Sequence, residues 1–284
     1  VFENFWKLVE RWKVSFFVMV PTASSALMQV EVNADVSSLR YALCGSAPLP
    51  KDLFNKFEQS TGLQILEGYG MTETTCLISG YPPAGTKKIG SVGIPFPYSD
   101  IKILNVNESG KVLKKCKVNE VGEICVNNPG VLVGKTYTDD HKNKNAYAYG
   151  THFRTGDLGK LDNDGYLWIT GRAKDLIIRG GHNVDPALIE ETLSGHPDVA
   201  MVGAIGQPDI NLGEVPCAYV ELIQGSDTHS EALMKFAQEK LDNKLAMPVH
   251  IEILSELPKT PVGKIFKPDL RKKAIIRIFN LEFG

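Results

Sequence analysis

Strand and helix patterns alternate along the first part of the chain, and this alternation constrains the fold more than any other feature of the sequence. Large apolar residues recur at helical spacing from Phe2 to Trp12, and a short apolar run follows from Val14 to Val20. This run predicts a buried strand that Pro21 ends, after which Thr22 caps a second helix. Together the expected elements are helices over residues 2–12, 22–30 and 50–59, and strands over 14–20, 39–44 and 64–66. Such an order is typical of a parallel sheet with crossover helices, so we predict an α/β lobe over residues 1–85.

The pattern changes after about residue 85. Short β-rich runs follow one another at 101–106, 120–126 and 167–170, with turn-forming residues between them and no helix-length apolar pattern. These runs predict a small antiparallel barrel or sandwich, and of the two we expect a β-barrel over residues 86–173.

From Lys174 onward the chain returns to mixed helix and strand patterns. The expected strands lie at 175–179, 199–206, 215–222 and 249–254, and the expected helices at 186–194 and 230–245. We predict a small α+β domain over residues 174–284, so the expected fold class is α/β with several domains. Because the chain starts with Val1 directly in a helix pattern, we expect the first lobe to be part of a longer one.

Composition excludes several classes of function. With 31 Lys and Arg against 33 Asp and Glu, the formal net charge is −2, which disfavours a dedicated nucleic-acid binder. The run from Val14 to Val20 is far shorter than the roughly 20 residues that cross a bilayer. Five scattered cysteines without a C-x-x-C pair favour a reducing compartment, and the six histidines lack metal-ligand spacing. We therefore expect a cytoplasmic protein, with peripheral membrane association left open.

The hexapeptide Gly68-Tyr69-Gly70-Met71-Thr72-Glu73 follows a predicted strand. It imitates the start of a dinucleotide-binding fingerprint, but Glu73 stands where the third glycine belongs, so we reject that interpretation. Two glycines let the backbone approach a flat ring closely while the face of Tyr69 packs against it. Thr72 offers a hydroxyl to a phosphate oxygen, and Glu73 offers a carboxylate that suits Mg²⁺. The alternative is a tight turn with Tyr69 in the core.

Three further positions offer groups that suit a nucleotide. The stretch Gly45-Ser46-Ala47-Pro48 follows a predicted strand, at the end where ligands collect in open α/β sheets, although a plain strand-to-helix turn explains the same letters. Asp157 has two acceptor oxygens for the hydroxyls of a ribose, and Arg172 has a fork of donors for ribose or phosphate oxygens. The alternatives are that Asp157 caps a turn and that Arg172 makes a surface ion pair.

Two loops of the predicted third domain carry further candidates. The loop from Pro258 to Lys264 is stiffened by glycine and proline, and a lysine held there can neutralise charge that develops on a phosphoryl or carboxylate oxygen. The alternative is a solvated surface lysine. Gly180 and Gly181 form a flexible turn before His182, and a loop histidine without a partner is usually neither a base nor a ligand.

The order of these motifs resembles that of the adenylate-forming enzymes, which include acyl-CoA synthetases, peptide-synthetase adenylation domains and luciferases. The motifs follow one another from residue 1 to about 275: Gly45–Pro48, Tyr69–Glu73, Gly122-Glu123, Thr155–Asp157, Gly171–Asp175, Gly180-Gly181 and Pro258–Lys264. Within the superfamily, the stretches Gly180–Pro186 and Val262–Lys267 make the chain most similar to medium- and long-chain fatty acid–CoA ligases.

This resemblance implies a two-step reaction that uses ATP, Mg²⁺ and CoA. A carboxylic acid, here a fatty acid, first forms acyl-AMP and pyrophosphate, and a CoA thiol then displaces AMP. The implied nucleotide-binding residues are Gly45, Ser46, Ala47, Pro48, Gly68, Tyr69, Gly70, Met71, Thr72, Asp157, Arg172 and Lys264, with Lys264, Thr72 and Glu73 catalytic. Glu73 is implied to hold Mg²⁺, Gly180 and Gly181 to contact CoA, and Lys174 to be the hinge on which the small domain turns.

The chain departs from the family pattern in one large respect. The Ser/Thr/Gly-rich phosphate loop that ends in a lysine is absent from the sequence, as is the first half of the large domain. We therefore expect the 284-residue chain to be inactive in adenylation by itself. Two alternatives remain open, namely an acyl-AMP ligase that loads a carrier protein and a non-catalytic module that binds AMP.

Overall fold

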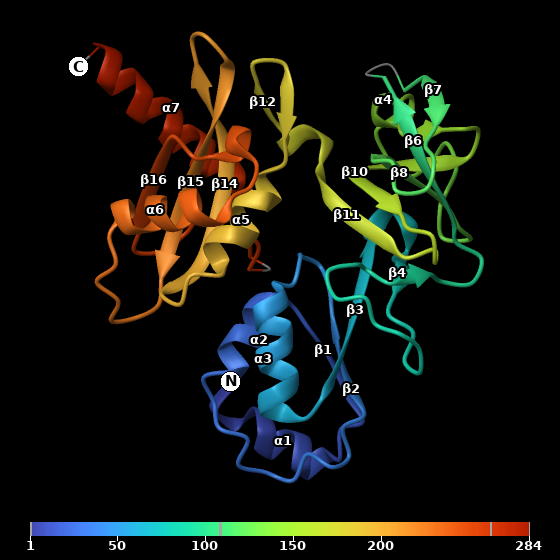
Figure 1. Ribbon diagram of the computed structural model, residues 1–284. Coiled ribbons are helices and arrows are strands. Elements are labelled where there is room, and N and C mark those ends of the chain that lie inside the picture. Colours follow the sequence, from blue (N-terminus) through green and yellow to red (C-terminus); the bar gives the residue numbers. More distant parts are fainter. Residues whose placement is uncertain (1, 108–109, 262, 284) are drawn as a thin grey trace. The chain divides into compact units, whose positions relative to one another are not determined.

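The computed structural model describes residues 2–107, 110–261 and 263–283 and shows two compact units, Val1–Thr170 and Gly171–Gly284 (Figure 1). The division falls close to Lys174, where the sequence predicts a boundary. Each unit is described by itself below.

The first unit begins with a sheet in the order β1-β2-β3-β4-β5, with β1 at Phe16–Met19, β2 at Tyr41–Cys44, β3 at Gln64–Met71, β4 at Cys76–Gly80 and β5 at Ile94–Pro95. The pairs β1–β2 and β2–β3 are parallel, which confirms the predicted parallel arrangement. Strand β3 pairs with β2 up to Glu67 and then, from Gly68 onward, pairs antiparallel with β4. A single extended strand therefore joins the α/β lobe to the antiparallel part of the unit.

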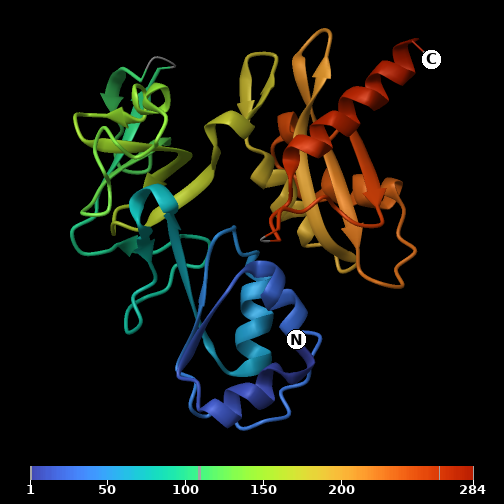
Figure 2. The ribbon, with the colours of Figure 1, turned by 180° about the vertical axis from the view of Figure 1, so that it is seen from behind.

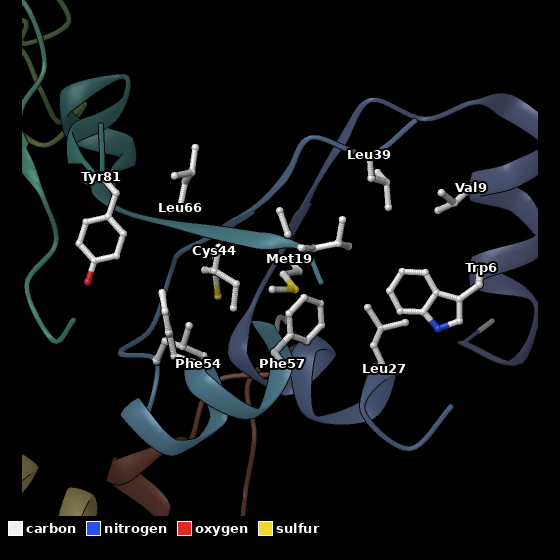
Figure 3. Close-up of a cluster of buried hydrophobic side chains, with 14 residues drawn as sticks. Trp6, Val9, Met19, Leu27, Leu39, Cys44, Phe54, Phe57, Leu66 and Tyr81 are labelled. Carbon is white, nitrogen blue, oxygen red and sulfur yellow. The ribbon is translucent and has the colours of Figure 1, made fainter. Parts of the chain in front are cut away.

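The helices of the lobe are α1 (Phe5–Trp12), preceded by a 3₁₀ turn at Phe2–Asn4, α2 (Pro21–Leu27) and α3 (Lys51–Thr61). Thr22 is not the cap that the sequence predicts: Val20 is the N-cap of α2 and Pro21 takes the first helical position, where its missing N–H costs nothing. Apolar side chains from all three helices meet those of the strands in one core, which includes Trp6, Phe54 and Phe57 (Figure 3).

Strand β1 is not the fully buried strand that its apolar run suggests. Phe16 is 47% exposed and Val18 is 72% exposed, whereas Met19 is buried. Phe16 lies against Tyr41 of β2 with the rings stacked, 5.7 Å between centroids. Successive side chains of a strand point to opposite faces, and in the described structure the helix-facing side of β1 is the covered one. An apolar run alone does not show which face of a strand is covered.

The antiparallel part of the first unit is a six-stranded sheet in the order β11-β10-β8-β6-β7, with β9 paired to β10. Its strands are β6 (Asp100–Val106), β7 (Val112–Lys115), β8 (Gly122–Asn127), β9 (Tyr147–Ala148), β10 (His152–Leu161) and β11 (Leu167–Arg172), and a short helix α4 spans Asp140–Asn143. Among the described residues no strand pairing closes this sheet, so the predicted barrel is instead an open sheet. It shares a core with β3 and β4, in which Tyr69 and Ile78 meet Ile103, Ile124 and Leu167.

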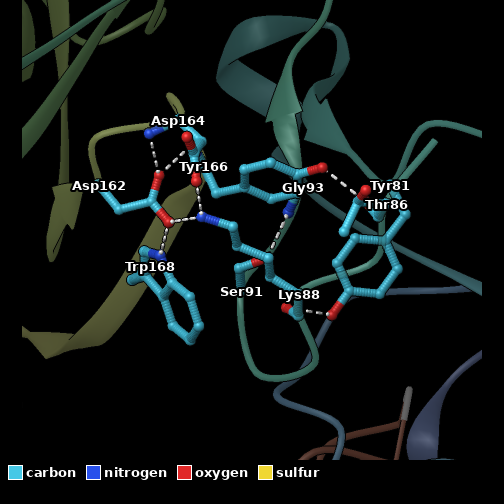
Figure 4. A network of polar contacts seen from close by, with 9 residues as sticks. All are labelled: Tyr81, Thr86, Lys88, Ser91, Gly93, Asp162, Asp164, Tyr166 and Trp168. Carbon is cyan, nitrogen blue, oxygen red and sulfur yellow. Dashed lines mark hydrogen bonds and ion pairs between the residues drawn. The ribbon is translucent and has the colours of Figure 1, made fainter.

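A polar network fixes the segment between β4 and β5 against the turn between β10 and β11 (Figure 4). The ammonium of Lys88 lies 2.6 Å from a carboxylate oxygen of Asp162 and 2.6 Å from one of Asp164, and it also lies over the ring of Tyr166. Asp162 accepts a further hydrogen bond from the indole of Trp168. Burial opposes ionisation of Asp162, but the donors around it together lower its pKa to about 2.

The second unit is built on a five-stranded sheet in the order β13-β12-β15-β14, with β16 parallel to β15. Its strands are β12 (Ile177–Arg179), β13 (His182–Val184), β14 (Val199–Asp209), β15 (Gly213–Leu222) and β16 (His250–Leu254). Helices α5 (Pro186–Ser194) and α6 (Ser230–Lys240) share one core with this sheet, and α7 (Lys267–Phe283), which the sequence analysis does not anticipate, contributes to a second core. Figure 2 shows this unit from behind.

The backbone at Gly93, directly before β5, packs closely against the backbone of Gly80. It has a φ of +77°, and a Cβ built there would lie 2.0 Å from the carbonyl oxygen of Gly80. Gly62 has a similar φ of +67° with open space around it. We expect Gly62→Ala to cost about 1 kcal/mol through the left-handed backbone alone, and Gly93→Ala to cost roughly 3 kcal/mol or more because backbone must also move.

The measurement is chemical unfolding followed by tryptophan fluorescence. All three tryptophans, Trp6, Trp12 and Trp168, lie in the first unit, so the signal reports that unit. Equal losses of stability in the two variants would contradict the packing described for Gly93.

Candidate nucleotide site

Two of the predicted motifs lie side by side at the end of the parallel strands. Cys44 is opposite Glu67 in the β2–β3 pair, so Gly45 and Gly68 follow at the same edge of the sheet. A Cβ on Gly45 would lie 2.9 Å from the carbonyl oxygen of Gly68. Ser46 has a φ of +73°, an uncommon conformation for a residue with a side chain and one that recurs at functional sites.

The first four residues of the hexapeptide belong to a strand and do not form a tight turn. Residues Gly68 to Met71 belong to β3, and only Thr72–Thr74 forms a turn of 3₁₀ helix. A Cβ on Gly70 would lie 1.7 Å from the carbonyl oxygen of Cys76 across the β3–β4 pair. The glycine at this position is therefore required by the approach of the chain to itself, whatever ligand lies nearby.

Tyr69 and Asp157 are brought together from strands β3 and β10. The Tyr69 hydroxyl donates a hydrogen bond of 2.6 Å to Oδ2 of Asp157. Tyr69 is 9% exposed and Asp157 is 5% exposed. The backbone N–H of Asp157 donates to the hydroxyl of Thr155, which in turn donates to the carbonyl of Ile124. Asp157 thus lies within a strand rather than at a turn, and both its side chain and its backbone are fixed.

Glu73 receives a hydrogen bond from a residue that sequence analysis does not find. The hydroxyl of Tyr137 lies 3.0 Å from Oε1 of Glu73 and donates to it. Burial is the main cause that raises the pKa of Tyr137 to about 12, and the carboxylate of Glu73 is the second cause. Tyr137 therefore stays protonated and donates a hydrogen bond at neutral pH. No local sequence pattern predicts a role for Tyr137, because it is a single aromatic residue in a segment without regular spacing of apolar residues.

Backbone strain concentrates directly after Glu73. Thr75 has a φ of +53° and Cys76 has a φ of +85°, although neither is glycine. The hydroxyl of Thr75 donates to the carbonyl of Gly130, and the amide of Asn128 donates to the carbonyl of Thr74. These contacts hold the segment after Glu73 in a costly conformation, as is common where a site is built.

Glu67 is a second group that sequence analysis does not find. Its carboxylate is 6% exposed, and Oε1 accepts a long hydrogen bond of 3.4 Å from the backbone N–H of Leu49. Burial raises the pKa of Glu67 to about 7, and the bond from Leu49 opposes this only in part. Glu67 therefore links the loop that contains Gly45–Pro48 to the strand that contains Gly68–Met71. A signal was available, since an acidic residue stands at an apolar strand position beside the glycines.

Glu123, in the Gly122-Glu123 motif, has a structural partner. Arg154 donates to it in a forked arrangement, with Nε and Nη2 lying 3.0 and 2.9 Å from Oε2. Glu123 is 7% exposed, so this is a nearly buried ion pair between β8 and β10.

The remaining predicted residues lie in the second unit. Arg172 ends β11, Lys174 lies in the 3₁₀ turn Ala173–Asp175, and Gly180 and Gly181, with φ of +56° and +81°, form the turn between β12 and β13. The loop of Lys264 is closed by hydrogen bonds from Thr260 N–H to Lys264 and from Phe266 N–H to Pro258, and Val262 within it lies outside the described residues. Because these residues and the first-unit site belong to separate units, their convergence stays a prediction.

Comparisons with known proteins identify the family. A model of the "AMP-binding enzyme" family matches residues 2–137, and a model of the "AMP-binding enzyme C-terminal domain" matches residues 188–264. The chain therefore belongs to the AMP-binding, adenylate-forming enzymes.

Individual relatives are similar along nearly the whole chain. Marinolic acid–CoA ligase from Pseudoalteromonas sp. (strain SANK 73390) is 46% identical over 275 residues, which are 96% of this chain and 42% of the relative. Long-chain-fatty-acid–CoA ligase from Bacillus subtilis is 35% identical over 263 residues, 92% of this chain and 46% of the relative. ATP-bound MatB from Rhodopseudomonas palustris has a TM-score of 0.87 at 30% identity, covering 96% of this chain and 53% of that structure. The chain thus spans about half the length of the relatives it matches.

Among the described residues, no helix has the length and apolarity to cross a membrane, and no group of three or more His, Cys, Asp or Glu side chains is arranged to hold a metal ion.

The raised pKa of Glu67 makes a prediction about stability and pH. A carboxyl whose pKa rises from 4.5 to about 7 on folding binds more protons in the folded state between these values, so stability falls as the pH rises through them. We expect Glu67→Gln to remove this loss and to stabilise the first unit at pH 8 by on the order of 3 kcal/mol, with little effect near pH 4.

Unfolding curves at both pH values, followed by tryptophan fluorescence, check this. Glu58→Gln is the control, because Glu58 is a partly exposed carboxylate of the same unit that pairs with Lys87. A Glu67→Gln variant that is equally stabilised or destabilised at both pH values would contradict the expectation.

Proposed function

We propose that this chain carries the nucleotide site of an AMP-forming acyl-CoA ligase. The enzyme would activate a carboxylic acid with ATP and transfer the acyl group to CoA. The single observation that carries the proposal is the assembly, within one unit, of the Gly45–Pro48 loop, the Gly68–Glu73 motif and Asp157. These motifs are far apart in the sequence, and a purely structural role does not require all of them within one unit, with Asp157 bonded to the tyrosine of the hexapeptide.

In the first step an oxygen of the substrate carboxylate attacks the α-phosphorus of ATP, and the bond to pyrophosphate breaks. The exposed hydroxyl of Thr72 would contact the α-phosphate, and the carboxylate of Asp157 would hold the ribose hydroxyls. Gly45–Pro48 and Gly68–Gly70 would enclose the adenine. Since Tyr69 is buried in the core and bonded to Asp157, its proposed contact with adenine would use only the remaining face of the ring.

The chemistry of Glu73 fits Mg²⁺. Oε1 accepts from Tyr137, a neutral donor that leaves the negative charge in place, and Mg²⁺ prefers few protein carboxylates together with water and nucleotide phosphates. When bound, Mg²⁺ would neutralise phosphate charge during the displacement.

The second unit would supply the groups that differ between the two steps. Lys264, exposed at the end of its closed loop, would stabilise charge on the attacking carboxylate and the phosphate, and Arg172 would contact the ribose. In the second step the CoA thiolate attacks the acyl carbon and AMP leaves. Rotation at Lys174 would then place the Gly180-Gly181 turn beside CoA, as a hinge residue allows.

We infer that the substrate is a fatty acid, since the ligases named above act on marinolic acid and on long-chain fatty acids. Loading of a carrier protein instead of CoA is the second candidate. We also infer that the enzyme is cytoplasmic, because its five cysteines are unpaired.

The test is pyrophosphate release by the full-length gene product with ATP, Mg²⁺ and a panel of fatty acids. We expect turnover that needs CoA for thioester formation, and no adenylation by residues 1–284 alone. Replacement of free CoA by a phosphopantetheinyl carrier separates the second candidate. A folded full-length protein that binds AMP but turns over no carboxylate would overturn the proposal in favour of a non-catalytic module.

Lys264→Ala tests the role of the loop lysine. We expect the rate of pyrophosphate release to fall by about 10²-fold or more, because charge stabilisation in the transition state is lost, with AMP binding changed little. Lys272→Ala is the matched control, since Lys272 is an exposed lysine of α7 paired only with Asp269 in the described structure. Equal rates in both variants would remove Lys264 from the mechanism.

A further inference from the structure

The hydroxyl, the backbone and the ring of Tyr137 each have partners in the described structure. Tyr137 lies between β8 and α4, and its hydroxyl donates to Oε1 of Glu73, 64 residues earlier in the chain. The hydrogen bond joins two segments that are far apart in the sequence. Its acceptor is the carboxylate that we propose binds Mg²⁺.

The backbone of Tyr137 is fixed by a buried side chain. Asn143, which is 8% exposed, accepts from the backbone N–H of Tyr137 at 3.0 Å and donates to its carbonyl at 2.7 Å. One amide thus occupies both polar groups of the Tyr137 backbone. This pairing sets the position from which the side chain extends.

The ring of Tyr137 is fixed by apolar contacts. It packs in a cluster with Val131, Ala146 and Phe153, to which Met71 also contributes, and its centroid lies 6.2 Å from that of Phe153. Met71 is two residues before Glu73 in the hexapeptide. The ring therefore rests on the same strand whose end presents the carboxylate.

We propose that Tyr137 is a positioning residue that orients the carboxylate of Glu73 for Mg²⁺. With Oε1 engaged by the tyrosine, the rotation of the Glu73 side chain is restricted and Oε2 is left for the metal and its nucleotide. Partners of metal-ligating carboxylates orient them in this way, and their loss typically weakens metal binding by 10- to 100-fold. The inference rests on the function proposed above.

Tyr147→Phe provides a matched control. Tyr147 belongs to the same cluster, lies against the same Phe153, and uses its hydroxyl to bind Leu132 and Thr136 of the same segment. In the described structure its hydroxyl bonds do not reach Glu73. Tyr147→Phe therefore loosens the same segment but keeps the hydrogen bond between Tyr137 and Glu73. Its effect on metal binding shows the contribution of the segment alone.

The experiment measures binding of Mn²⁺ with ATP to the full-length gene product, from the electron paramagnetic resonance signal of free Mn²⁺. We expect Tyr137→Phe to weaken Mn²⁺ binding about tenfold and Tyr147→Phe to leave it unchanged. In a Glu73→Gln background, Tyr137→Phe should have no further effect, because the two residues act through one contact. Unfolding followed by tryptophan fluorescence verifies that each variant is folded.

The other outcomes separate the two proposals. If Glu73→Gln weakens Mn²⁺ binding and Tyr137→Phe does not, the positioning role is wrong and the assignment of Glu73 stands. If both tyrosine variants weaken binding equally, the segment as a whole matters and the specific role of the Tyr137 hydroxyl is overturned. If Glu73→Gln has no effect, the metal assignment fails, and the inference fails with it.

Discussion

The first unit depends on the change of partner within strand β3. Up to Glu67 the strand pairs parallel with β2, and from Gly68 it pairs antiparallel with β4. The same residues therefore end a parallel sheet, where loops converge, and begin the sheet whose core holds Tyr69. This is possible only where the chain can approach itself closely. A Cβ on Gly70 would lie 1.7 Å from a carbonyl oxygen of β4. The glycines of the motif therefore allow β3 to pair closely with β4, in addition to any close approach of a ligand.

The spacing of apolar residues in the sequence predicted most helices and strands. It did not predict contacts between residues that are far apart in the sequence. Helix α5 spans Pro186–Ser194 as expected, and the first three strands are parallel, because apolar spacing and order carry these features. The glycine-rich hexapeptide was open to interpretation as a turn, since glycine favours turns, whereas pairing with β4 makes it a strand. The exposed face of β1 and the contact of Tyr137 with Glu73 depend on distant partners, and no local pattern contains that information.

The second unit presents its candidate groups on two preformed loops. The Gly180-Gly181 turn closes the β12–β13 pair, and the Lys264 loop is closed by its own backbone hydrogen bonds. Apolar cores on helices α5, α6 and α7 brace the sheet that supports both loops. The rotation proposed at Lys174 would carry both loops as parts of one unit.

Both candidate carboxylates of the first unit accept a hydrogen bond from a tyrosine, and this choice of partner has a chemical reason. Tyr69 donates to Asp157 and Tyr137 donates to Glu73, whereas the carboxylate of Glu123 pairs with Arg154. A guanidinium neutralises the carboxylate that it orients and competes with a metal ion for it. A neutral hydroxyl restricts a carboxylate without removing its charge, and this leaves the charge of Glu73 available to Mg²⁺. The bond from Tyr137 therefore fits the metal-binding role proposed for Glu73, whereas the ion pair with Arg154 fits Glu123 as a link between two strands.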